Sequence, residues 1–284
     1  MISFLSKALV LASIFLLQAA FTQTSFGYNQ SKSAFTYEFS KPAIDFEDGI
    51  SNNLFLGTHY LGFNAIVTPK LTIVGEMPLA HLSISSDRIG DIATTQEGNP
   101  YIGLQLKRPD FPFALEIGSH IPLVNSSELS HLIGLSSDFT ERFESFAPNT
   151  LPVKILGNRV FSNASGQFIH LRIGPSVLFN LAESGEATTG DGTQVHILTA
   201  LQAGIENENI RFNIGYSSRF LLSENIGFGG NELYHLAGFR GSLKFSLYEP
   251  FIIFKKPLNK DYSKLSNTIF SIGLRITQSK SSLR

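Results

Sequence analysis

The sequence VHILTALQAGIENENIRFNIGYSSRFLL, residues 195–222, alternates between two kinds of side chain on both sides of a short polar centre, Glu206–Asn209. One face carries Val195, Ile197, Thr199, Leu201, Ala203 and Ile205 before the centre, and Ile210, Phe212, Ile214, Tyr216, Ser218 and Phe220 after it. A period of two is the period of a β-strand. The stretch therefore predicts two antiparallel strands joined by a tight turn.

Both arms of this hairpin are longer than ten residues, whereas strands in soluble domains usually have about five or six. The face opposite the apolar one holds arginines and glycines, among them Arg211, Arg219 and Gly204. Long strands with one continuous apolar face suit an all-β, antiparallel up-and-down transmembrane barrel. In such a barrel the apolar face meets lipid and the polar face lines a wet lumen.

The N-terminus has the layout of a secretory signal peptide. Lys7 is followed by an apolar run over residues 8–17 and then by Ala19 and Ala20. We expect cleavage near residues 19–22. An uncleaved anchor helix is the alternative, but a bilayer span needs about 20 apolar residues and this run is shorter. The sequence thus predicts a signal peptide over 1–22 and a single barrel domain over 23–284.

Composition excludes several classes of function. The chain has no cysteine, which rules out disulfide scaffolds and thiolate chemistry. Its formal net charge of −1 gives no electrostatic case for binding nucleic acid. With 25 Phe, 8 Tyr and no Trp, any aromatic girdle at the bilayer interfaces must consist of Phe and Tyr.

Periodicity predicts about twelve strands, joined alternately by long loops and short turns. The strands are 33–40, 54–67, 71–79 with an extension to 85, 101–108, 113–121, 152–162, 168–179, 195–205, 210–222, 233–248, 251–256 and 268–277. The long loops are 41–52, 86–99, 124–151, 182–192, 223–231 and 259–266, and the short turns are 68–70, 109–112, 163–166, 206–209 and 249–250. Outer-membrane barrels separate short periplasmic turns from long extracellular loops in this way. The segment 33–40 is either the first strand or a leader outside the barrel.

The longest interruption, residues 124–151, contains a predicted short amphipathic helix. Asp138 to Glu141 has the pattern of a capping box. Phe139, Phe143 and Phe146 stand at helical spacing. Such a helix either folds into the barrel mouth as a constriction or packs on the outer rim, and we favour the rim.

Taken together, the chain resembles a bacterial outer-membrane β-barrel: a signal peptide, twelve strands over nearly the whole mature length, and a last alternating strand at 268–277. The resemblance implies an outer-membrane location, a lipid bilayer as partner and a pore-like or transporter-like role of no particular subfamily. One departure is that the chain continues through residues 278–284, whereas such barrels often end on an aromatic residue.

The face opposite the apolar one predicts the lining of the lumen. The lining residues are Glu76, Lys107, Glu116, His120, His170, Arg172, His196, Arg211, Arg219, Arg240, Lys244 and Arg275, with Glu38 on the first strand. Seven of these side chains are basic and three are acidic, an excess of four positive charges. Charges that line a pore tune which ions pass, so we expect the lumen to favour anions. The alternative is that paired charges fill a narrow interior as a polar plug.

No pattern in the sequence favours an enzyme or a cofactor. Neither a G-x-S-x-G elbow, an H-E-x-x-H zinc helix nor a P-loop occurs. His59, His81, His131 and His235 lie near serines, but without a pattern that indicates catalysis. We therefore predict a barrel that passes or binds small polar solutes, anions among them. The alternatives are a structural or surface-binding protein with a plugged lumen, an outer-membrane hydrolase, which is less favoured, and a secreted soluble β-domain.

Overall fold

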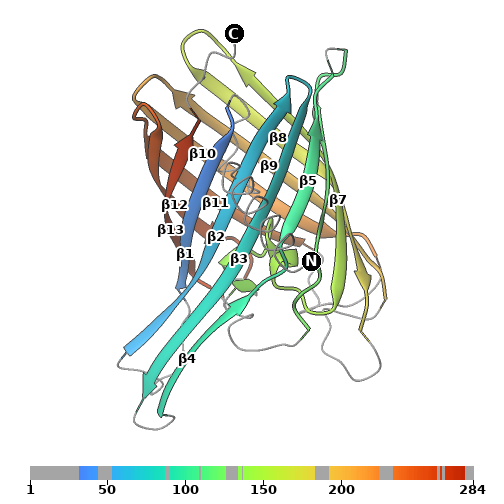
Figure 1. Ribbon diagram of the computed structural model, residues 1–284, viewed down its shortest axis with the longest axis vertical. Helices are drawn as coiled ribbons and strands as arrows, with labels where there is room; N and C mark the ends of the chain where they lie inside the picture. The colour runs from blue at the N-terminus through green and yellow to red at the C-terminus, as the bar shows by residue number, and fades with distance from the viewer. Residues whose placement is uncertain are drawn as a thin grey trace, which may run out of the picture.

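The chain folds as a closed antiparallel barrel of twelve strand positions in the computed structural model (Figure 1). The structure describes residues 32–43, 53–86, 90–108, 110–125, 134–135, 137–182, 192–223, 233–260, 263 and 266–278. The predicted signal peptide lies outside these residues. Neighbouring strands follow one another in the order β1-β13-β12-β11-β10-β9-β8-β7-β6-β5-β3-β2. The predicted fold class is therefore confirmed.

The strands run alternately up and down the wall. Their bounds are β1 Ala34–Ala43, β2 Asn53–Thr68, β3 Leu71–Ser86, β4 Gly90–Glu97, β5 Tyr101–Leu106, β6 Ala114–His120, β7 Thr150–Ser162, β8 Gln167–Asn180, β9 Gln194–Glu206, β10 Ile210–Leu221, β11 Leu233–Leu243, β12 Tyr248–Pro257 and β13 Thr268–Thr277. In the hairpin of β9 and β10, Arg211 pairs with Glu206, Tyr216 with Leu201 and Leu221 with His196. This is the hairpin that the sequence predicts.

The first and last strands close the ring. β1 pairs with β13 along its whole length, from Ala34 opposite Thr277 to Ala43 opposite Thr268. On its other side β1 lies against β2, where Phe39 stacks on Phe55 with ring centroids 5.7 Å apart. The segment 33–40 therefore contributes a strand to the wall and is not a leader outside it.

Two local predictions are wrong. Residues 90–97, expected within a polar loop, form β4, which pairs with β3 beyond the level at which β5 takes over. The β-branched residues Thr94 and Thr95 suit this strand, although its polar composition is typical of a loop. In Figure 1 β2, β3 and β4 extend past the barrel at one end. The turn expected at 249–250 lies earlier, because the Phe245 amide donates to the Tyr248 carbonyl oxygen at 2.8 Å.

Exposure is inverted relative to a soluble domain. Outward side chains such as Ile102 and Ile214 are more than half exposed, at 54% and 56%, whereas inward Arg240 and Lys255 are at most 1% exposed. An apolar outer surface with charges inside fits a lipid-facing barrel. Within the described part of the chain, no helix is long and apolar enough to cross a membrane.

Candidate functional site: a plugged lumen

Part of the longest loop fills the barrel interior. We call residues 134–135 and 137–147 the plug. Asp138 organises its turn, since its carboxylate accepts hydrogen bonds from the Glu141 amide and the Thr140 hydroxyl, both at 3.1 Å. A 3-10 helix, Phe143–Ser145, follows. All described plug side chains from Ser137 to Ala147 are buried, so the rim position that we favoured is wrong.

The three phenylalanines of the plug anchor it by apolar contact. Phe139 lies 4.8 Å from Phe143 and 4.4 Å from Tyr234 of β11, measured between ring centroids. The phenylalanines share one buried cluster with wall residues, among them Tyr60, Ala80, Leu178, Leu236, Ile253 and Ile269. Burial of aromatic side chains contributes a large part of packing energy in proteins. The helical spacing of these phenylalanines therefore correctly predicted that they pack on an apolar surface, but it did not predict that this surface lies in the lumen.

Three plug carboxylates meet basic side chains of the wall. Glu144 lies 2.7 Å from the Arg219 guanidinium of β10 and 2.8 Å from the Lys154 ammonium of β7. Asp138 lies 2.7 Å from the Lys255 ammonium of β12. The third pair joins Glu141 to Arg172 of β8 at 3.5 Å. Burial of a charge is tolerated when an opposite charge and hydrogen bonds compensate for lost water.

The one basic residue of the described plug meets two acidic side chains of the wall. Arg142 contacts Glu38 of β1 at 3.1 Å and Glu76 of β3 at 2.7 Å. Its guanidinium carbon also stands 3.7 Å from the centre of the Tyr60 ring, a cation–π geometry. The plug therefore complements an acidic patch on β1 and β3 as well as a basic patch on β7, β8, β10 and β12.

The plug enters the barrel at the long-loop end, where Asn99 ties it to the rim. The Asn99 side-chain amide donates to the carbonyl oxygens of Glu144 and Ala147, at 3.0 and 2.8 Å. Its carbonyl oxygen accepts hydrogen bonds from the Val124 and Leu123 amides, both at 2.8 Å. A side chain on neighbouring Gly98 would come 2.4 Å from the Ser145 carbonyl oxygen. The rim and the plug are thus in direct contact.

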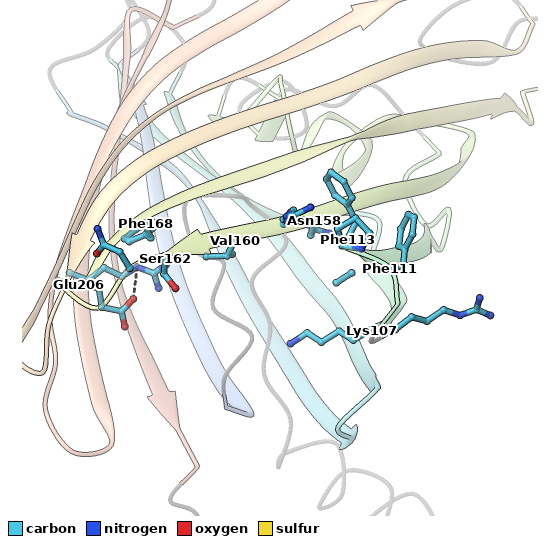
Figure 2. A pocket seen from close by; sticks show the side chains of 15 residues that line it. Lys107, Phe111, Phe113, Asn158, Val160, Ser162, Phe168 and Glu206 are labelled. Atoms are coloured by element: carbon cyan, nitrogen blue, oxygen red, sulfur yellow. Dashed lines mark ion pairs between the residues drawn. The ribbon is translucent and has the colours of Figure 1, made fainter.

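The short-turn end of the lumen remains hollow. Two cavities of about 680 and 460 Å³ lie there, and Glu206 lines both. Lys107 lines the larger one (Figure 2). Glu206 is held 2.7 Å from the Lys244 ammonium and 3.6 Å from the Arg211 guanidinium. We call these two cavities the vestibule.

The structure brings the predicted lining residues into two regions of the lumen, the plug and the vestibule. The plug contacts Glu76, Arg172 and Arg219, and Glu116 lies 3.0 Å from Arg172. The vestibule is lined by Lys107, Arg211, Lys244 and Arg275. Glu249 lies 3.6 Å from the Arg275 guanidinium and 3.2 Å from that of Arg240. The three predicted histidines, His120, His170 and His196, are buried. The role of all these residues in solute passage stays a prediction.

Sequence reasoning missed the plug charges and two basic residues of the wall that bind them. Lys154 lies in β7, the strand with the weakest pattern, although Val153 and Ile155 on either side point outward. Lys255 lies in a segment that is apolar on both faces, so its direction follows only from pairing with β11 and β13. The sequence feature that could have indicated the plug is the position of acidic residues directly beside Phe139 and Phe143.

A low pH is expected to weaken the docking of the plug on the wall. Burial alone would raise the pKa of the Glu144 carboxyl, but Arg219 and Lys154 outweigh it and hold that pKa well below its usual range. Lys255 likewise keeps the pKa of Asp138 lowered against the effect of burial. Both carboxyls bind protons more weakly in the docked plug than in water, where their pKa is about 4. Docking is therefore favoured above about pH 4 and weakens as the pH falls through the docked-state pKa.

Ion current across planar bilayers at stepwise lower pH can check this expectation, because an undocked plug leaves the lumen free. We expect the plug to stay docked from neutral pH to about pH 4 and to undock more often below it, because the unpaired carboxyl has a pKa of about 4. Glu144→Gln should weaken the dependence on pH. Opening on raising the pH instead would contradict the assignment of these carboxylates.

Comparisons with known proteins agree with the fold. No protein-family model matches the chain, and no curated protein sequence is similar to it. Among solved structures, the chain resembles the translocator domain of the autotransporter NalP from Neisseria meningitidis, with 8% identity, a TM-score of 0.53 and 96% of each chain covered. It also resembles an outer-membrane channel from Pseudomonas putida F1, with 14% identity, a TM-score of 0.50, and 89% of this chain and 97% of that one covered.

At such low identities the likeness shows the fold alone. That fold is the one of bacterial outer-membrane β-barrels, as the sequence predicted.

Proposed function

We propose that the chain is an outer-membrane channel for small polar solutes, chiefly anions, and that the plug closes it in the conformation described. We further propose that residues 1–22 are a cleaved signal peptide, because Lys7 precedes an apolar run that ends in small residues. Such a channel needs a lining that attracts its solutes and a plug that can move out of the lumen.

The charge of the wall carries the proposal. Among the described wall residues, seven buried side chains are basic, Lys154, Arg172, Arg211, Arg219, Arg240, Lys255 and Arg275, and four are acidic, Glu38, Glu76, Glu116 and Glu249. The wall thus has an excess of three positive charges. The described plug contributes three acids and one base, which leaves an excess of one. An open lumen would favour anions, because the charges that line a pore select ions by sign.

The attachment of the plug supports its role as a gate. The two ends of its loop lie side by side, since the Asn149 amide donates to the Val124 carbonyl oxygen at 2.8 Å. The Asn149 side chain also donates to the Asn125 carbonyl oxygen at 3.2 Å. Pairing of β6 with β7 involves no plug residue. Removal of the plug therefore leaves the backbone ladder of the wall intact.

Excision of the plug tests the proposed function. Residues 126–148 would be replaced by two glycines that join Asn125 to Asn149, whose backbones are already adjacent. We expect this variant to conduct in planar bilayers and to show a reversal potential of anion selectivity, while the parent protein stays mostly closed. Further loss of Arg219 and Lys255, as Arg219→Gln and Lys255→Met, should lower the anion preference. Cation selectivity, or no conductance after excision, would overturn the proposal.

A structural or surface-binding protein is the second candidate function. The density of ion pairs between plug and wall favours it, because a permanently filled lumen needs such contacts. The parent protein separates the two functions: a surface-binding protein would stay closed at every pH and anion concentration, and excision would abolish binding to its partner. We propose no enzymatic activity, since the buried carboxylates Glu144, Asp138 and Glu76 all serve as partners of basic side chains.

A further inference from the structure

Three wall residues from three strands surround the Glu144 carboxylate. The Arg219 guanidinium lies 2.7 Å from one oxygen, the Lys154 ammonium 2.8 Å from the other, and the Ser176 hydroxyl donates to the first at 2.7 Å. The Glu144 and Ser176 residues have no exposed surface, and Lys154 and Arg219 are 1% exposed. Two charged donors and a hydroxyl around two oxygens are the features of an oxyanion-binding site.

The donors belong to the wall, whereas the anion belongs to the plug. Lys154, Ser176 and Arg219 stand on β7, β8 and β10, whose pairing with their neighbours does not involve the plug. Strands hold binding residues more rigidly than loops do. When the plug leaves, the three donors therefore remain on the wall facing the lumen.

We propose that Lys154, Ser176 and Arg219 form an oxyanion site for the carboxylate or phosphate group of a passing solute, and that Glu144 occupies this site as a built-in competitor. The inference rests on the proposed anion channel and adds to it a binding site and a cause of opening. A solute that binds the site stabilises the undocked plug by mass action. Lys255 and Arg172 hold the other two plug carboxylates nearby on the wall, so a solute with several acidic groups would displace more than one contact.

A thiol reporter in the full-length protein tests the proposal. The chain has no cysteine, so Ser145→Cys places a single thiol in the plug at a residue that is 1% exposed. A neutral maleimide labels this thiol only when the plug undocks. The labelling rate would be measured at one pH in sodium phosphate and in sodium chloride of equal ionic strength, which removes general screening from the comparison.

We expect labelling to be faster in phosphate and to rise with its concentration. The ratio of the two rates should reach about ten when phosphate is at ten times its dissociation constant. In Arg219→Gln the basal rate should rise and the ratio should fall to about one. Lys256→Gln is the matched control, because Lys256 is exposed on the outward side of β12 and should keep the ratio of the parent.

Equal rates in phosphate and chloride would overturn the proposal and leave Glu144 as a structural contact of the plug. An unchanged phosphate ratio in Arg219→Gln would overturn it as well, since phosphate would then act elsewhere. The channel function fails separately: if phosphate speeds labelling but the excised barrel does not conduct, the oxyanion site stands and the proposed channel does not.

Discussion

Replacing Arg142 by methionine is expected to undock the plug. The guanidinium of Arg142 lies within 3.1 Å of both Glu38 and Glu76, which are buried in the wall. Its loss leaves two carboxylates beside each other with no countercharge from the plug. Removal of one partner from a buried ion pair costs about 3–5 kcal/mol. Since about 1.4 kcal/mol changes an equilibrium tenfold, the undocked population should rise by about two to four orders of magnitude.

The rate of maleimide labelling at Ser145→Cys measures this population. Arg159→Met is the matched control, because Arg159 contacts Phe161 and Phe113 and no plug residue. Arg142→Lys should give an intermediate rate, since one ammonium keeps the charge but lacks the planar fork that reaches two carboxylates at once. If Arg142→Met labels no faster than Arg159→Met, the acidic patch does not hold the plug.

The wall could be predicted because a strand with lipid on one side and a lumen on the other repeats every two residues. This repeat placed β9, β10 and β13 within a residue or two of their observed ends. It failed for β4, whose polar residues form a strand only because β3 offers a free edge beyond β5. It failed again at Glu249, which belongs to β12 and pairs with Arg275. Pairing between strands, which periodicity does not report, decided both cases.

The position of the plug could not be predicted for a different reason. Helical spacing showed that Phe139, Phe143 and Phe146 need an apolar surface, and both the rim and the lumen could offer one. Whether the plug lies at the rim or in the lumen depends on the charges of the wall, because Glu144 enters the interior only if basic side chains there pair with it. One of those partners, Lys154, lies on a strand with a weak pattern. The excess of four positive charges that the sequence predicted is close to the excess of three found on the wall. The acidic residues of the plug, which that prediction did not include, cancel most of this charge.

Glu144→Gln should undock the plug more than Lys154→Met does, although the two substitutions break the same ion pair. Glu144 serves two cations, at 2.7 and 2.8 Å. Without Lys154, the carboxylate still forms a balanced pair with Arg219. Without the carboxylate, Lys154 and Arg219 face each other in a buried site and repel. Uncompensated buried charge is the costly outcome, at about 3–5 kcal/mol, whereas the loss of one of two cations leaves the site neutral.

Labelling at Ser145→Cys should therefore be at least about tenfold faster in Glu144→Gln than in Lys154→Met, a difference of about 1.4 kcal/mol in docking. The double variant gives a sharper result. Adding Lys154→Met to Glu144→Gln removes one of the two repelling cations, so the combined change should cost less than the sum of the single changes. Equal effects of the single variants would mean that Glu144 binds Lys154 alone and that Arg219 takes no part, whereas an additive double variant would mean that Glu144 and Lys154 do not interact. A larger effect of Glu144→Gln would thus show that the plug carboxylate also holds Arg219, the residue expected to bind the passing anion.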